Sequence, residues 1–175
     1  MGTRSRIGVM HGNKVKSVYC HWNGSVEHNG AVLQEYYDSG LANHLVALGD
    51  MSTLGTSIGE AHPFSPHVLE NSEFKALSPE EQDRIKAETS AAYEAAKKAG
   101  WCTFYGRDRD EKNTEFRVAQ TFEAFLDQCD NCAAEYYYIM RDGEWYCGTT
   151  YQNTHPLSRT LTALTEALTT QKEVA

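Results

Sequence analysis

Residues 4–22 read Arg-Ser-Arg-Ile-Gly-Val-Met-His-Gly-Asn-Lys-Val-Lys-Ser-Val-Tyr-Cys-His-Trp, and this stretch decides the fold class. Two runs of strand length, 4–11 and 15–22, flank the turn His11-Gly-Asn-Lys14. Gly and Asn tolerate the positive φ angles that a tight hairpin turn demands. The sequence therefore predicts an antiparallel β-hairpin at the start of the chain.

Side-chain alternation gives the second of these strands two different faces. Val18, Cys20 and Trp22 share one face, which we expect to lie in the core. Tyr19 and His21 share the other face, which we expect to be a polar surface. His21 is therefore a candidate hydrogen-bond donor to a ligand, with Tyr19 beside it. The alternative is that His21 only holds the following turn through a backbone hydrogen bond.

Arg4 and Arg6 lie on one side of the first strand. Both are candidates for binding an anionic group, because the guanidinium fork matches phosphate oxygens two at a time. Whether they lie beside Tyr19 and His21 depends on the register of the hairpin, which the sequence leaves open.

A second hairpin is predicted over residues 135–147, turning at Arg141-Asp-Gly143. Ser78-Pro-Glu-Glu81 is a capping box with proline at the first helical position, so a helix is expected from there to Gly100. Further helices are expected around 26–37, 40–48, 121–132 and from Pro156 onward. Two hairpins with interspersed helices predict an α+β fold, in which a mainly antiparallel sheet is covered by helices.

Residues 49–77 contain several glycines and prolines without sustained periodicity, so we expect a long loop. The helix that follows has few apolar side chains, which indicates an exposed or protruding element. We expect one domain covering residues 1–175, in which about 65–100 form a loop plus an inserted helix.

Composition restricts the class of protein. The apolar fraction of 41% is typical of a globular chain, and no apolar run is long enough to span a membrane. No secretion signal is evident, so we expect a cytoplasmic protein. The formal charge of −8 argues against general binding to nucleic-acid backbones, although a local basic pocket could still hold a small anion. Five cysteines in a reducing compartment make a disulfide framework improbable.

The segment Trp101-Cys-Thr-Phe-Tyr-Gly-Arg-Asp-Arg109 runs from an aromatic strand into a charged loop. Arg107 and Arg109 are candidates for phosphate contacts, and Trp101 and Tyr105 offer ring faces on which a base could stack. The equal alternative is a solvated loop, because residues 106–117 hold four basic and four acidic side chains that can pair with one another.

Catalytic chemistry is poorly supported. Cys129 and Cys132 have the spacing of half a zinc site, but no second close pair completes it. Cys20 and His21 are adjacent in a strand and point to opposite faces, which disfavours a nucleophile–base pair. Dinucleotide, phosphate-loop and serine-hydrolase motifs are missing. We therefore expect no catalytic residue, no metal site and no cofactor.

Five segments carry a resemblance to known proteins: Arg4-Ser-Arg-Ile, Tyr-Cys-His-Trp-Asn-Gly at 19–24, Leu-Gly-Asp-Met-Ser-Thr-Leu-Gly at 48–55, Phe-Tyr-Gly-Arg-Asp-Arg at 104–109 and Tyr-Tyr-Ile-Met-Arg-Asp-Gly-Glu-Trp-Tyr at 137–146. Together they resemble a family of small proteins of bacteriophages and prophage-bearing bacteria. Relatives usually carry Asp where this chain has Asn23, and many have a shorter link before Phe-Tyr-Gly-Arg. The resemblance therefore implies that the helix at 78–99 is an insertion.

Small accessory phage proteins of this kind are often counter-defence factors, including ones that sequester nucleotide signals made by host immune enzymes. The resemblance implies such a context and supplies no binding residue. Our leading hypothesis is a noncatalytic homo-oligomer that captures a small nucleotide-derived anion. One alternative is an acidic inhibitor that blocks a host defence protein. The other is a phosphodiesterase or related hydrolase that uses His21 and Asp108 as acid and base.

Overall fold

The structure, a computed structural model, describes residues 2–64, 72–151 and 154–174. One open sheet of eight strands has the order β4-β3-β2-β1-β6-β7-β8, and β5 pairs with β2 beside β3. The strands are β1 (Ser5–His11), β2 (Lys14–Cys20), β3 (Met51–Thr53), β4 (Thr103–Phe104), β5 (Arg117–Ala119), β6 (Tyr136–Arg141), β7 (Glu144–Thr149) and β8 (Thr162–Ala163).

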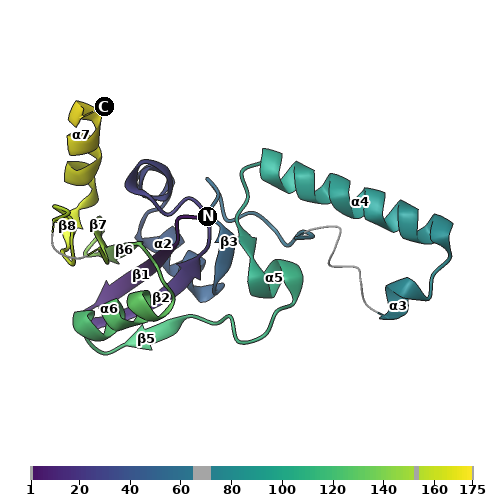
Figure 1. Cartoon of the computed structure of the whole chain (residues 1–175), viewed down its shortest axis with the longest axis horizontal. Helices are drawn as coiled ribbons and strands as arrows, with labels where there is room; N and C mark the ends of the chain where they lie inside the picture. The colour runs from purple at the N-terminus through teal and green to yellow at the C-terminus, as the bar shows by residue number, and fades with distance from the viewer. Residues whose placement is uncertain (1, 65–71, 152–153, 175) are drawn as a thin grey trace.

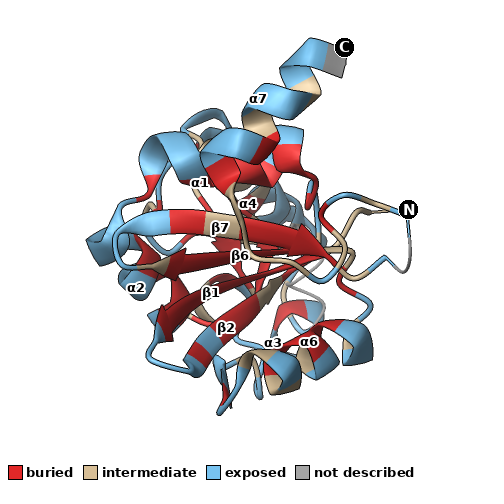
Figure 2. Cartoon of the chain, turned by 90° about the vertical axis from the view of Figure 1, so that its left-hand side faces the viewer, coloured by how far each residue is buried: buried red, intermediate tan, exposed pale blue. Residues whose placement is uncertain are grey.

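Helices surround this sheet and complete the α+β fold. They are the π-helical turn η1 (Val26–Gly30), α1 (Ala31–Tyr36), α2 (Ser39–Ala47), α3 (Ser72–Lys75), α4 (Pro79–Lys98), α5 (Tyr105–Arg109), α6 (Phe122–Asn131) and α7 (Leu164–Val174). Figure 2 shows the sheet between α1 and α7 on one side and α6 on the other. None of the helices in the described ranges is both long and apolar enough to cross a membrane.

Both predicted hairpins are confirmed, and they lie side by side through their inner strands. β1 pairs with β2 antiparallel, β6 pairs with β7 antiparallel, and β1 pairs with β6 in parallel. In the first turn only Gly12 has a positive φ, of 60°. In the second turn Asp142 and Gly143 both have positive φ, of 51° and 80°. The parallel contact in the middle of an otherwise mostly antiparallel sheet was not predicted.

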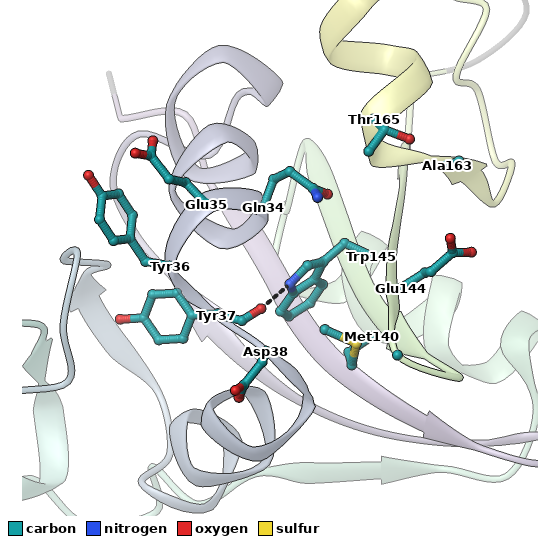
Figure 3. A pocket seen from close by; sticks show the side chains of 11 residues that line it. Gln34, Glu35, Tyr36, Tyr37, Asp38, Met140, Glu144, Trp145, Ala163 and Thr165 are labelled. Atoms are coloured by element: carbon teal, nitrogen blue, oxygen red, sulfur yellow. Dashed lines mark hydrogen bonds between the residues drawn. The ribbon is translucent and has the colours of Figure 1, made fainter.

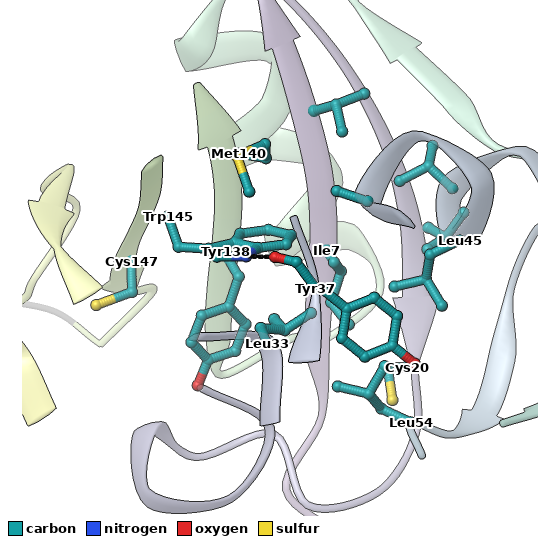
Figure 4. Packing of buried hydrophobic residues seen from close by; sticks show 14 of the residues in the cluster. Ile7, Cys20, Leu33, Tyr37, Leu45, Leu54, Tyr138, Met140, Trp145 and Cys147 are labelled. Carbon is teal, nitrogen blue, oxygen red and sulfur yellow. Dashed lines mark hydrogen bonds between the residues drawn. The ribbon is translucent and has the colours of Figure 1, made fainter. Parts of the chain in front are cut away.

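The larger of two hydrophobic clusters fills the face of the sheet under α1, α2 and α7. It brings Ile7 of β1 and Tyr138 of β6 against Leu33 of α1, and all three side chains are fully buried (Figure 4). The Tyr138 hydroxyl donates to the Gly24 carbonyl at 2.7 Å, which satisfies a buried polar group. A smaller cluster joins Phe125 and its neighbours on α6 to the opposite face.

Helix α4 begins at the predicted capping box, where Ser78 accepts from the Glu81 N–H and the Glu81 carboxylate accepts from the Ser78 N–H. Figure 1 shows α4 projecting to one side of the sheet, as its polar composition predicted. Only Thr89 and Ala96 of this helix are buried.

Several expectations were wrong. Residues 51–53 of the expected long loop form β3, and residues 105–109 of the expected charged loop form α5. The last helix begins at Leu164 and not near Pro156. These elements are short or depend on distant strands, so their own sequence has no periodicity to reveal them. The part of the expected loop over residues 65–71 lies outside the described residues.

We expect Tyr138→Phe to lower the free energy of unfolding by about 1–3 kcal/mol, because it leaves the buried Gly24 carbonyl without its donor. Urea denaturation followed by circular dichroism measures this change. Tyr146→Phe is the matched control, since the Tyr146 hydroxyl bonds to the exposed Glu144 carboxylate. Equal stability of the two variants would contradict the role given to the Tyr138 hydroxyl.

Candidate functional site

The hairpin register decides which polar residues of β1 and β2 share a face of the sheet. Arg6 pairs with Tyr19 and Ser5 pairs with Cys20, so Arg4 follows opposite His21. Cys20 points to the other side, into the larger core cluster. The register therefore brings Arg4, Arg6, Tyr19 and His21 together, which the sequence alone left open.

Tyr19 links the members of this group. Its hydroxyl lies 2.8 Å from His21 Nδ1, and the positive charge of Arg4 acts on the same side chain, where it opposes the rise in pKa that burial causes. When the Tyr19 hydroxyl donates to Nδ1, its oxygen can still accept from a cationic donor such as Arg4. His21 then carries its own proton on Nε2, where it can donate to a ligand. The Tyr19 backbone N–H donates to Asp50 Oδ1 at 2.8 Å.

The pKa shifts of His21 and Tyr19 keep both side chains in their neutral forms. Partial burial, and secondly the nearby charge of Arg4, lower the pKa of His21 below its ordinary value of 6.5. Burial raises the pKa of Tyr19, although Arg4 opposes that effect. Both side chains are therefore neutral at pH 7 and each keeps a proton to donate.

Two further rings lie near this group, Tyr105 at the start of α5 and Phe64 in the segment after β3. We call Tyr19, Tyr105 and Phe64 the aromatic band. Burial raises the pKa of Tyr105, and the neighbouring Tyr19 adds to the effect. Phe64 stacks on Tyr105 with ring centroids 5.9 Å apart, and the guanidinium of Arg109 lies 5.1 Å from the centre of the Phe64 ring. The aromatic band thus has Arg4 and His21 at one end and Arg109 at the other.

Arg6 lies beneath this surface and does not contact solvent freely. Its side chain is only 2% exposed, and it donates from Nε to Ser17 Oγ and from Nη2 to the Ser17 carbonyl, both at 3.0 Å. Its Nη1 reaches only the Cys132 sulfur, at 3.8 Å. Burial raises the pKa of Asp50, and the bond from the Tyr19 N–H and the charge of Arg6 oppose that effect only in part. Arg6 therefore contributes positive charge to the site from below.

Arg107 has a structural environment and is separate from the Arg4 group. Its guanidinium donates to both Asp108 oxygens, to the carbonyls of Ile58 and Gly59, and to the Cys102 carbonyl, with distances from 2.9 to 3.1 Å. These five contacts use the donor capacity of an arginine. Asp108 also accepts from the backbone N–H groups of Phe104 and His62. This network fastens residues 58–62 to the turn between β4 and α5.

Trp101 and Arg109 differ in how far they remain accessible to a ligand. The Trp101 ring packs so closely on Gly59 that a Cβ there would lie 2.2 Å from its Cγ. The Trp101 ring therefore packs against the loop at Gly59, and that face of the ring is not open for stacking on a ligand. Arg109 pairs with Glu111 at 3.0 Å, but its side chain is 46% exposed, so it remains accessible beside Phe64. Of the two loop arginines, only Arg109 keeps the position expected of a ligand contact.

The acid–base pair of the hydrolase alternative is not assembled. Both Asp108 oxygens are occupied by Arg107 and backbone N–H groups, whereas His21 is paired with Tyr19. Cys20 is fully buried on the opposite face, and burial raises its pKa to about 12. The described residues contain no group of three or more His, Cys, Asp or Glu side chains able to hold a metal ion.

Three site residues escaped sequence reasoning. Trp22, expected in the core, is 45% exposed with its ring edge-on to His21 at 4.7 Å, because the strand ends at Cys20 and alternation no longer applies. Phe64 lay in the expected loop. Asp50 belongs to the segment Leu-Gly-Asp-Met-Ser-Thr-Leu-Gly at 48–55, in which no spacing or periodicity marked it as a site residue.

Comparisons of the chain with protein-family models, with curated proteins and with solved structures find no match.

Arg107→Ala should lower the free energy of unfolding by about 3–5 kcal/mol, because it leaves the fully buried Asp108 carboxylate without its cation. Arg109→Ala should change it by about 0–1 kcal/mol, since the Arg109–Glu111 pair is exposed. Urea unfolding monitored by tryptophan fluorescence compares the two variants. A mild effect of Arg107→Ala would contradict the structural role of Arg107.

The pKa of His21 should lie below 6.5 and rise in Arg4→Ala, where the neighbouring positive charge is gone. NMR titration of the His21 Hε1 resonance measures both values, and Lys14→Ala at the hairpin turn is the charge-matched control. Because the folded pKa is lowered, the unfolded chain binds more protons just below pH 6.5, so stability falls as the pH drops through that window. An unchanged His21 pKa in Arg4→Ala would contradict the electrostatic interaction between His21 and Arg4.

Proposed function

We propose that the protein is a noncatalytic binding protein that captures a small anionic, nucleotide-derived molecule on the face of the sheet that carries Arg4 and His21. The observation that carries this proposal is the aromatic band of Tyr19, Tyr105 and Phe64, with cationic or hydrogen-bond-donating side chains at both ends. A base can stack on the rings, and phosphate oxygens can accept from Arg4 and His21.

Local charge supports an anionic ligand in spite of the acidic composition. Neither Arg4 nor Arg6 forms an ion pair with a carboxylate of the described residues. Two carboxylates lie near them: Asp50 accepts from the Tyr19 N–H, and Glu135 accepts from the Arg4 N–H at 3.4 Å. Because neither carboxylate forms a salt bridge with the guanidinium of Arg4, that guanidinium remains available to a phosphate.

Capture without turnover is favoured by how the reactive groups are engaged. His21 is hydrogen-bonded to Tyr19, Asp108 is bonded to Arg107, and the Cys20 thiol lies in the core on the other side of the sheet. Within the phage context that the motif resemblance implies, the ligand would be a nucleotide signal of host defence. The homo-oligomer expected from the sequence stays a prediction.

Isothermal titration calorimetry with AMP, ADP, ADP-ribose and cyclic di-AMP tests the proposal. We expect at least one of them to bind, and Arg4→Ala to weaken that binding by about ten- to a hundredfold, as expected for the loss of a charged hydrogen bond. Arg141→Ala is the matched control, because Arg141 lies over the Tyr146 ring in the second hairpin. Denaturing the complex should release the ligand intact.

Two results would contradict the proposal. Recovery of an altered nucleotide would indicate an enzyme, and His21→Ala would then be expected to abolish turnover. Equal weakening by Arg4→Ala and Arg141→Ala would indicate nonspecific attraction and remove the assignment of the site to this face.

A further inference from the structure

A groove with a different chemistry lies on the other face of the sheet. One pocket of about 530 Å³ lies between the end of α1, the second hairpin and the start of α7 (Figure 3). A second pocket of about 350 Å³ lies between the tips of both hairpins and the start of α2. Both pockets are lined by Met140 and Gly143, so they form one groove, which we call the acidic groove.

The floor of the acidic groove is apolar and held in place. The Trp145 indole donates from Nε1 to the Tyr37 carbonyl at 2.8 Å, as the dashed line in Figure 3 marks. Trp145, Tyr37 and Met140 belong to the larger core cluster and are each 4% exposed. Because core packing and a hydrogen bond fix these side chains, the floor presents a preformed surface for apolar atoms.

The rim of the groove is negatively charged. Glu35, Asp38 and Glu144 line the first pocket and Asp142 lines the second, and all four are exposed. None of the four forms an ion pair with a cation of the described residues. Among the described residues that line the two pockets there is no lysine or arginine, and His11 is their one basic side chain.

The carboxylates are held by neutral donors that leave their charge intact. Asp38 accepts from the Leu41 N–H at the start of α2, and Glu144 accepts from the Tyr146 hydroxyl. Glu35 raises the pKa of Tyr36 through its charge and a hydrogen bond, and the Tyr36 ring is 44% exposed at the edge of the groove. The rim thus combines uncompensated negative charge with an exposed aromatic ring.

We propose that the acidic groove docks a basic segment of a partner protein. A lysine or arginine side chain has an apolar stem and a cationic head, which match the apolar floor and the acidic rim respectively. Charge complementarity excludes an anionic ligand here. The four carboxylates are spread over both pockets, so an extended peptide with several basic side chains can meet more of them than one small polyamine can.

This surface is independent of the proposed anion site. Trp145 and Met140 pack with Ile7 on the face of β1 that is opposite to Arg4 and Arg6. A ligand on one face therefore contacts none of the residues that line the other. Loss of one binding activity with retention of the other would separate the two proposals.

Fluorescence anisotropy with a labelled octapeptide of alternating lysine and leucine tests the docking proposal on the full chain. We expect saturable binding that weakens by about tenfold or more in the double variant Glu35→Lys, Glu144→Lys, since two rim charges change from attraction to repulsion. The control double variant, Glu88→Lys with Asp127→Lys, makes the same change in net charge at exposed positions on α4 and α6. It should bind like the unchanged protein.

Each other outcome overturns the proposal. No binding, or equal weakening in both double variants, would show that the groove has no specific role. Competition by spermidine at the concentration of the peptide itself would identify a small-cation site. A concentration-dependent dimer in sedimentation velocity that disappears in Glu35→Lys, Glu144→Lys would assign the groove to a second copy of the chain.

Discussion

The register of the first hairpin is the constraint on which the rest of the structure depends. Ile7 pairs with Val18 on the core side, and Arg6 pairs with Tyr19 on the other. A slip of one residue would carry every side chain of β2 to the opposite face and would drive Tyr19 into the core. The turn at Gly12, with φ of 60°, fixes the pairing by allowing only two residues between the strands. Burial of one face and assembly of the polar group on the other are thus consequences of one turn.

The sequence predicted those parts of the fold that have a local physical cause. Both hairpin turns contain a glycine that adopts positive φ, and the capping box at Ser78 begins α4 where expected. The parallel pairing of β1 with β6 could not be predicted, because it joins segments more than a hundred residues apart. The same holds for β3, which has only three residues and depends on the edge of β2.

The candidate site shows a similar division. Alternation correctly put Tyr19 and His21 on one face, but it could not say that Arg4 would lie beside them. The sequence also could not distinguish Arg107 from Arg109, since each is followed by an acidic residue. The positions of the two arginines in the folded protein distinguish them. Arg107 faces loop carbonyls and becomes part of the interior, whereas Arg109 pairs with Glu111 in solvent and extends over Phe64.

Net charge is a poor guide to what this chain can bind, because its charges are sorted by the sheet. Among the described residues, the side chains of Arg4 and Arg6 form no ion pair on one face, and the carboxylates around Trp145 form none on the other. Salt screens exposed charges over a Debye length of about 8 Å, so each face presents mainly its own charges to a ligand. The formal charge of −8 therefore affects long-range attraction and solubility, whereas the local charges of each face determine which ligand that face can bind.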